Sequence, residues 1–196
     1  MFDVLYNNTA SNQAPKLDDY EKSVFLTKAQ DEIIKNHFTA TSNSKNQGFD
    51  DNFKRQSEFA PLIKVVKVNP VNQGSIEKID QRSRLYWFPT DYFLSVNEEI
   101  HEATSDPELF YQYVVNPIHY TEYKRLMLKP YQYPVKKTAW RLINGIHTNT
   151  AAQQSCLCVE LIGNFHENTT LTYRLRYVKQ PVPIILANLT EGEYAG

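Results

Sequence analysis

The stretch Leu17-Asp-Asp-Tyr-Glu-Lys-Ser-Val-Phe-Leu-Thr-Lys-Ala-Gln-Asp-Glu-Ile-Ile-Lys-Asn-His-Phe38 predicts one long helix, around which the rest of the fold is expected to form. Asp18 is a short acceptor that suits the N-cap position, and Glu21 follows three residues later as its partner in a capping box. Asp19 places negative charge at the positive end of the helix dipole. We therefore expect a stable helix start at Asp18.

Apolar side chains fall on two sides of this predicted helix. One side carries Tyr20, Val24, Ile34 and Phe38, and the other carries Leu26, Ala29 and Ile33, with Phe25 between them. The pattern by itself slightly favours a helix buried deep in its own domain. The alternative is a helix that packs on its own domain by one stripe and on a neighbouring subunit by the other.

The composition indicates one globular domain and restricts the classes of function. A chain of 196 residues with 41% hydrophobic residues can bury a core. The net charge of -1 argues against a protein whose whole surface binds nucleic acid. Thirteen tyrosines contribute to an aromatic fraction of 13%, and tyrosine suits half-buried interfaces as well as tyrosine-rich strands.

The two cysteines and the N-terminal residues argue against a disulfide-bonded, secreted or membrane-spanning protein. Cys156 and Cys158 alternate within a strand-like run, which disfavours a disulfide between them, and we expect both to be small core residues. The first residues lack the pattern of a signal peptide, and no apolar run reaches the length of a membrane span. We expect a soluble protein that is made in the cytoplasm and has no membrane partner.

Breaks in the pattern divide the chain into three parts. Polar and turn-forming residues predict an N-terminal arm over residues 1–16, and residues 187–196 form a polar tail. Between them we expect a single α+β domain over residues 17–186, with an exposed loop at 39–48.

Within this domain, the sequence predicts short helices and several strands. Residues 49–59 suit a short helix with Phe49, Phe53 and Phe59 facing inward, and residues 117–128 suit a second main helix. Strands are expected over 62–68, 83–88, 139–143, 155–162 and 169–178, with a strand or short helix over 92–96 and a solvated acidic segment over 98–102. The predicted fold class is α+β: a long N-terminal helix and a second helix packed on an antiparallel β-sheet that ends in a C-terminal hairpin.

The sequence shows no motif of a catalytic, cofactor-binding or metal site, so none is predicted. The histidines are scattered without the spacing of metal ligands. His101 or His119 with Glu98 or Glu102 could form an acid/base pair, but a chain of this size offers such coincidences often.

Two local patterns suggest binding surfaces. In the strand over 169–178 apolar residues alternate with Thr172, Arg174 and Arg176, and with Lys179 the arginines form a basic stripe. This stripe suits nucleic acid or an acidic partner, or is an ordinary solvated face. The cluster Tyr86-Trp87-Phe88 points to both sides of its strand, which indicates a sheet covered on both faces or an interface.

Two parts of the chain resemble a family of virion structural proteins in large tailed phages of Bacteroidota, including the crAss-like phages. The resemblance lies in Phe2-Asp-Val-Leu-Tyr-Asn-Asn8, in residues 17–35 and in Gly48-Phe-Asp-Asp-Asn-Phe-Lys-Arg-Gln56. It continues in Tyr133-Pro-Val-Lys-Lys-Thr-Ala-Trp-Arg-Leu142 and in Tyr173-Arg-Leu-Arg-Tyr-Val-Lys-Gln-Pro-Val-Pro-Ile-Ile-Leu186.

The resemblance implies a non-enzymatic ring protein of the virion neck or tail. It implies a homo-oligomer, in adaptors commonly of twelve subunits, that joins the portal and neighbouring ring proteins to the tail barrel around the DNA channel, with transient contact to passing DNA. Subunits of a closed ring meet through heterologous contacts. The expected interface residues are Tyr20, Val24, Leu26, Ala29, Ile33, Tyr86, Trp87 and Phe88. Charged substitutions at Leu26 or Ile33 are expected to block assembly and leave the monomer folded.

Other classes of function stay open at this point. The chain could be a head-associated accessory protein, a DNA-binding packaging or cargo protein that uses the basic stripe, or a small intracellular enzyme that uses His101 or His119. The resemblance does not decide which ring of the neck or tail the chain forms.

Overall fold

The computed structural model describes residues 17–39, 48–50, 52–71, 76–103, 110–129, 131, 133–134, 137–149, 152–166 and 170–186. The chain forms two compact units: a helical unit, residues 1–58 and 181–196, and a barrel unit, residues 59–180. The arm over 1–16, most of the loop over 39–48 and the tail over 187–196 lie outside the described residues. The single domain over 17–186 stays a prediction.

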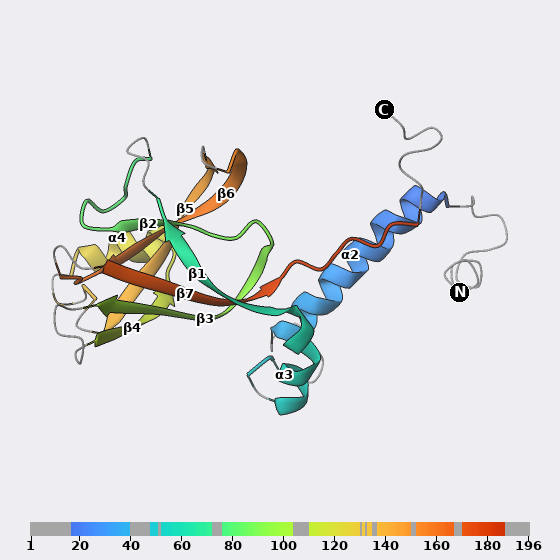
Figure 1. Ribbon diagram of the computed structural model, residues 1–196, viewed down its shortest axis with the longest axis horizontal. Helices are drawn as coiled ribbons and strands as arrows, with labels where there is room; N and C mark the ends of the chain where they lie inside the picture. The colour runs from blue at the N-terminus through green and yellow to red at the C-terminus, as the bar shows by residue number, and fades with distance from the viewer. Residues whose placement is uncertain are drawn as a thin grey trace. The chain divides into compact units, whose positions relative to one another are not determined.

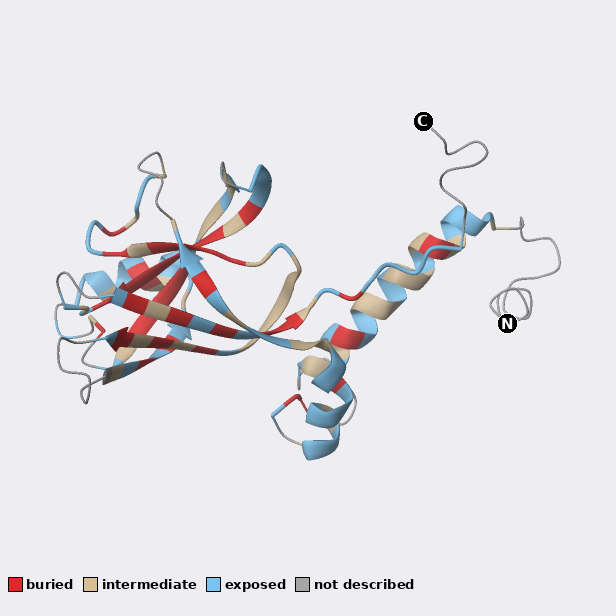
Figure 2. Cartoon of the chain, viewed as in Figure 1, coloured by how far each residue is buried: buried red, intermediate tan, exposed pale blue. Residues whose placement is uncertain are grey.

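The helical unit contains α2 (Asp19–Phe38) and all but the last residue of α3 (Phe53–Phe59). The predicted long helix and its capping box are confirmed, because the Glu21 carboxylate accepts the Asp18 N–H at 3.1 Å and Asp18 caps the first turn. Along α2 only Ser23 and Ile34 are buried, and most of the helix surface is exposed or half-buried (Figure 2). The interpretation of α2 as a deeply buried helix was therefore wrong.

The helix predicted over residues 49–59 forms only over Phe53–Phe59, and two of its three predicted inward-facing aromatics are confirmed. Phe49 is buried and stacks on Phe38 with ring centroids 5.5 Å apart, and Phe59 is also buried. Phe53 is 83% exposed, so its predicted burial was wrong. Six residues of helix turn the chain by about 240°, so Phe53 and Phe59 cannot share one face of α3.

Seven strands of the barrel unit close into a barrel (Figure 1). After the 3₁₀ turn η2 (Ala60–Leu62) they are β1 (Ile63–Pro70), β2 (Arg84–Trp87), β3 (Tyr92–Ala103), β4 (Phe110–Pro117), β5 (Thr138–Asn149), β6 (Gln154–Gly163) and β7 (Thr170–Lys179). Around the barrel the order is β1-β2-β6-β5-β4-β3-β7, and β7 then pairs with β1. The predicted fold class, with helices packed on an open antiparallel sheet, was therefore wrong.

The pairing of the strands differs from the prediction more than their positions do. The last two strands lie where expected, but they form no hairpin: β6 pairs with β2 and β5, and β7 pairs with β1 and β3. β4 was missed, and its pairing with β5 is parallel. β3 runs through residues 98–102, where Glu98 and Glu102 are buried, so the prediction of a solvated segment was wrong.

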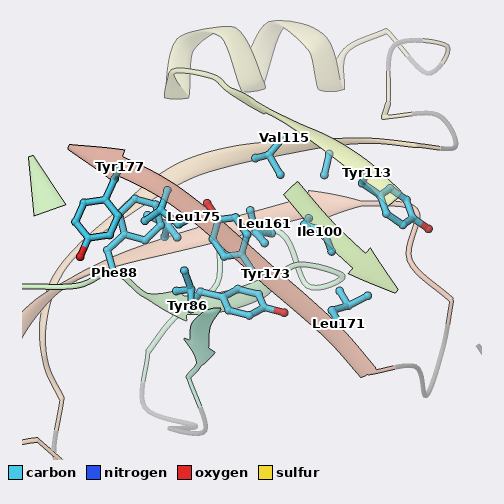
Figure 3. Close-up of a cluster of buried hydrophobic side chains, with 13 residues drawn as sticks. Tyr86, Phe88, Ile100, Tyr113, Val115, Leu161, Leu171, Tyr173, Leu175 and Tyr177 are labelled. Carbon is cyan, nitrogen blue, oxygen red and sulfur yellow. The ribbon is translucent and has the colours of Figure 1, made fainter. Parts of the chain in front are cut away.

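Side chains fill the interior of the barrel, as expected for a barrel of this strand number. The apolar face predicted for β7 is confirmed, since Leu171, Tyr173, Leu175 and Tyr177 are all buried (Figure 3). The remaining members of this interior cluster are Val68, Tyr86, Phe88, Ile100, Tyr113, Val115, Ala139, Val159 and Leu161. The Tyr86 and Tyr173 rings meet edge to face at 5.2 Å.

Two smaller clusters cover parts of the outer barrel surface. Trp87 packs with Leu85 and both cysteines, which are free and buried as expected. Burial raises the pKa of the Cys158 thiol to about 11, which makes it an inert core residue. The second helix, α4 (Tyr120–Met127), is confirmed and contributes Tyr123 to a cluster with Trp140, Leu142 and Ile162.

A buried carboxylate on the outside of β6 holds the loop before β2. Glu160 accepts the backbone N–H groups of Ile79 and Asp80, both at 2.9 Å, and Asn144 Nδ2 donates to it at 3.1 Å. Ser83 also donates its hydroxyl to Glu160. These hydrogen bonds fix the loop against the barrel, where Ile79 packs on the cluster beneath α4.

Candidate assembly surfaces

The first half of α2 carries residues 181–186 as an extended strap (Figure 1). Two hydroxyls one helical turn apart hold the strap. Ser23 Oγ accepts the Leu186 N–H at 2.8 Å, and Thr27 Oγ1 accepts the Ile184 N–H at 3.1 Å. Because both bonds use side chains of α2, the strap follows the helix without a strand partner.

A groove of about 380 Å³ lies between α2 and the strap. Its lining is almost entirely apolar and consists of Tyr20, Ser23, Val24, Thr27, Lys28, Pro183, Ile184 and Ile185. Two predicted interface residues, Tyr20 and Val24, therefore line the groove. Sequence reasoning missed the strap, because no local signal relates residues 181–186 to a helix that lies far away in the sequence.

A second surface of α2 is an exposed line of side chains at helical spacing, here called the outer stripe: Glu21, Phe25, Ala29, Glu32 and Ile33. Phe25 is 54% exposed and Ile33 is 57% exposed. Ala29 and Ile33 were predicted interface residues, whereas predicted Leu26 is half-buried beside the stripe.

The helical unit exposes many large apolar side chains for its size. They are Tyr20, Phe25, Ile33, Phe53, Val182, Ile184, Ile185 and Leu186. Exposed apolar side chains that gather on one part of a protein often mark a site of contact with another molecule.

The aromatic cluster on β2 lies elsewhere. Tyr86 and Phe88 are buried in the barrel interior, and Trp87 is buried in the outer cluster with the cysteines. Their burial supports the interpretation of a sheet covered on both sides. A role for them in subunit contacts stays a prediction.

The outer surface of β1 and β7 forms a basic face of three exposed side chains, Lys67, Arg174 and Arg176. Lys67 lies directly opposite Arg174 in the strand register, and Val65 lies opposite Arg176. Lys179 is half-buried and lies at the end of β7. The sequence analysis found both arginines but missed Lys67, because only the register of β1 with β7 brings them together.

Buried carboxylates of the barrel accept hydrogen bonds from tyrosine hydroxyls. Glu98 accepts from Tyr173 at 2.6 Å, and Glu102 accepts from Tyr113 at 2.5 Å. Burial raises the pKa of both tyrosines above the ordinary value, and the hydrogen bond to the neighbouring carboxylate raises it further. Tyrosines are thus used in the core of the chain, where their hydroxyls satisfy buried acids.

The acid/base hypothesis also depends on these carboxylates. Besides Tyr173, Glu98 pairs with Arg141, whose Nε lies 2.9 Å from it. Glu102 accepts the His166 backbone N–H at 2.8 Å, and His101 Nε2 lies 2.9 Å from Glu99. Glu98 and Glu102, the two buried glutamates of the acid/base hypothesis, thus both have partners within the folded chain.

A small cavity of about 160 Å³ lies near His166, lined by Tyr111, Tyr113, Lys137, Asn164, Phe165 and His166. His166 stacks on Tyr111 with ring centroids 5.3 Å apart. Among the residues that the structure describes, no group of three or more His, Cys, Asp or Glu side chains is arranged to hold a metal ion. No described helix is long and apolar enough to span a bilayer.

Exposed apolar side chains on the helical unit, together with a basic outer face on the barrel, are typical of a protein that contacts other molecules. Comparison with known proteins then gives the family: a model described as phage tail ring protein 3/4 matches residues 1–194, and this chain belongs to that family. The expected membership among ring proteins of crAss-like phages is confirmed.

Two curated relatives come from Bacteroides phage crAss001. Ring protein 4/5 is 43% identical over 193 residues, which cover 98% of this chain and 75% of the relative. Ring protein 3 is 24% identical over 193 residues, which cover 97% of this chain and 78% of that relative. This chain is therefore a structural component of a phage tail, and a place in the virion follows from that class.

Proposed function

We propose that this chain is the repeating subunit of a ring in the phage tail and that its helical unit supplies a main contact between subunits. The observation that carries the proposal is the exposed apolar surface of the helical unit, above all Phe25 and Ile33 on the outer stripe. A surface of this kind is stable in water when another chain covers it. Ring closure requires each subunit to present two different patches to its two neighbours.

The finer assignment follows the family resemblance. In this proposal the ring connects the portal to the tail barrel, surrounds the DNA channel and contains twelve copies of the chain. The net charge of -1 supports a channel position, because a wall that lets DNA slide must not neutralise many phosphates. The protein is made in the host cytoplasm and acts in the virion.

The test is the mass of the purified chain and of an Ile33→Asp variant, by light scattering, alone and mixed with the portal and tail proteins of the same phage. Loss of the apolar contact should weaken each subunit contact by about 1 to 2 kcal/mol, or roughly 5- to 30-fold. The far-UV circular dichroism of Ile33→Asp should be unchanged, since this side chain is already in water in the monomer.

Leu128→Asp is the matched control, because Leu128 is also an exposed apolar residue but lies just after α4 in the barrel unit. It should assemble like the unaltered chain. An unaltered chain that stays monomeric in every mixture would contradict the ring proposal. Normal assembly by Ile33→Asp would show that the outer stripe is not part of the contact.

A further inference from the structure

The hairpin of β5 and β6 continues beyond the part of the barrel where other strands pair with it (Figure 1). β4 pairs with β5 only over Thr138–Arg141, and β2 pairs with β6 only over Cys158–Leu161. Past these points, among the described strands, β5 and β6 pair only with each other, up to Asn149 opposite Gln154. This end of the hairpin, residues 145–149 and 154–156, is here called the hairpin tip. Each of its two strands has a side that no described strand occupies.

The hydrogen bonds of the barrel show which backbone groups of the tip point outward. The C=O of Leu157 accepts the N–H of Phe88 at 2.8 Å, so the backbone groups of Leu157 point away from β5. In an antiparallel pair, residues opposite each other point both inward or both outward, and the two kinds alternate. Ile146, opposite Leu157, therefore also points outward. Two residues further along, Thr148 and Ser155 form the next outward pair.

The outward backbone groups of the tip lie at the surface. Ile146 is 73% exposed, and Thr148 and Ser155 are exposed as well. Within the part of the chain that the structure describes, no hydrogen bond uses the outward N–H or C=O of these three residues. The β5 side of the tip thus offers two residues for pairing with a further strand, and the β6 side offers one.

The sequence of the hairpin lacks the residues that usually protect an open strand edge. Natural edge strands carry charged side chains or proline, which hinder pairing with another chain. Residues 142–159 contain no Lys, Arg, Asp, Glu or Pro, although 22% of the chain is charged. A bulge between Ile143 and Gly145 precedes the tip, and the register is regular from Gly145 to Asn149. Both sides of the tip can therefore accept a strand.

We infer that the hairpin tip is a contact between copies of this chain, in which the β5 side of one copy pairs with the β6 side of the next. The two open sides lie at the same level of the hairpin, since Thr148 is opposite Ser155. Because β5 and β6 run in opposite directions, copies that follow one another around a ring present antiparallel strands to each other.

The two sides of the tip differ, so this contact is heterologous and repeats until a ring closes. Pairing of two β5 sides would instead be isologous and would stop at two copies. The inference rests on the proposed ring function and adds a second contact between the subunits.

Proline at the outward positions tests the inference. Thr148→Pro removes the outward N–H on the β5 side, and Ser155→Pro removes it on the β6 side. Neither N–H takes part in the pairing of β5 with β6, so both variants should fold. Each variant alone should assemble about 10- to 100-fold more weakly than the unaltered chain in light scattering, because hydrogen bonds of the added strand are lost.

Charged variants repeat the test without a change of the backbone. Ile146→Lys and Ser155→Lys place a charge on each side of the tip, as natural edge strands do, and should weaken assembly in the same way. Val114→Lys is the matched control, because Val114 is 58% exposed on β4 and is paired with both β3 and β5. It should assemble like the unaltered chain. Circular dichroism and the melting temperature establish that each variant is folded.

Mixing of the two proline variants gives the decisive result. Thr148→Pro keeps an intact β6 side, and Ser155→Pro keeps an intact β5 side. At a concentration at which neither variant assembles alone, the mixture should therefore form pairs of one copy of each and nothing larger.

Three results separate the inference from the ring proposal. Assembly of both proline variants and both lysine variants like the unaltered chain would overturn the inference and leave the ring proposal standing. Normal assembly by the Ser155 variants with loss in the Thr148 variant would also overturn it, because the β5 side would then pair with something other than β6. Failure of the unaltered chain to assemble, alone and with the portal and tail proteins of the same phage, would overturn the ring proposal itself.

Discussion

The ion pair between Arg141 and Glu98 inside the barrel gives the most direct test of the structure. Arg141 Nε lies 2.9 Å from Glu98 Oε2, and the two side chains are 8% and 3% exposed. The guanidinium also lies 5.6 Å from the centre of the Phe88 ring. Truncation of Arg141 to Met would keep much of the buried volume but leave the charge of Glu98 in the core without its cationic partner, hydrogen-bonded to the hydroxyls of Tyr173 and Ser95.

Breaking a buried pair in this way costs about 3 to 5 kcal/mol of unfolding free energy. For a domain of this size each kcal/mol lowers the melting temperature by about 2 to 4 °C, so Arg141→Met should melt roughly 6 to 20 °C below the unaltered chain. The double variant Glu98→Gln/Arg141→Met should recover at least half of the loss, because a neutral amide can still accept the Tyr173 hydroxyl.

Urea denaturation followed by tryptophan fluorescence and by circular dichroism measures these differences. The control is Arg125→Met, which removes an arginine that is 71% exposed and lies 3.9 Å from Glu122 on α4. An exposed pair of this kind contributes about 0 to 1 kcal/mol. If Arg141→Met costs no more than Arg125→Met, or if the double variant is as unstable as the single one, the Glu98 carboxylate is not held in the interior as described.

Two further predictions concern the barrel. Tyr113, Tyr173 and Tyr177 have raised pKa values, first because they are buried and then because each donates to a carboxylate. Their stabilising effect is complete below the unfolded-state pKa of about 10 and is lost as the pH rises above it, by roughly 1.4 kcal/mol per pH unit for each tyrosine. Denaturation between pH 9 and about 11.5 should show this decline, with a shallower slope in Tyr177→Phe, and an equal slope in both would contradict it. Gly163→Ala should cost about 1 to 3 kcal/mol in the same assay, because the new Cβ would lie 2.7 Å from the Phe165 ring, and a neutral effect would show that this ring moves freely.

The sequence predicted those elements whose formation depends on residues close together in the chain, namely α2, β7 and α4. The capping box of α2 needs only Asp18 and Glu21, and both lie within one helical turn. The alternation along β7 identified its buried and exposed faces, because successive side chains of a strand point to opposite sides. The position of α4 followed from helical spacing and the proline after it.

The closure of the sheet depends on contacts that no local pattern contains. β7 could pair with β6 as a hairpin or with β1 and β3, and its alternation is the same in both cases. Glu98 and Glu102 resemble solvated residues until Tyr173 and Tyr113 are known to point at them. For the same reason the sequence alone gave only two of the three side chains of the basic face.

Closure of the barrel also restricts how this protein can assemble. An open sheet has edge strands whose free backbone groups pair with another chain, and closure removes such edges. Here β4 pairs with β5 only over Thr138–Arg141, so among the described strands β5 beyond Arg141 pairs with β6 alone. Where the barrel is closed, its contacts with other subunits use side chains on the outer surface, where charge and shape decide the partner. Substitutions in the interior, as at Arg141, should then change how much folded subunit is present, and substitutions at Ile146 or Ile33 should change what the folded subunit binds.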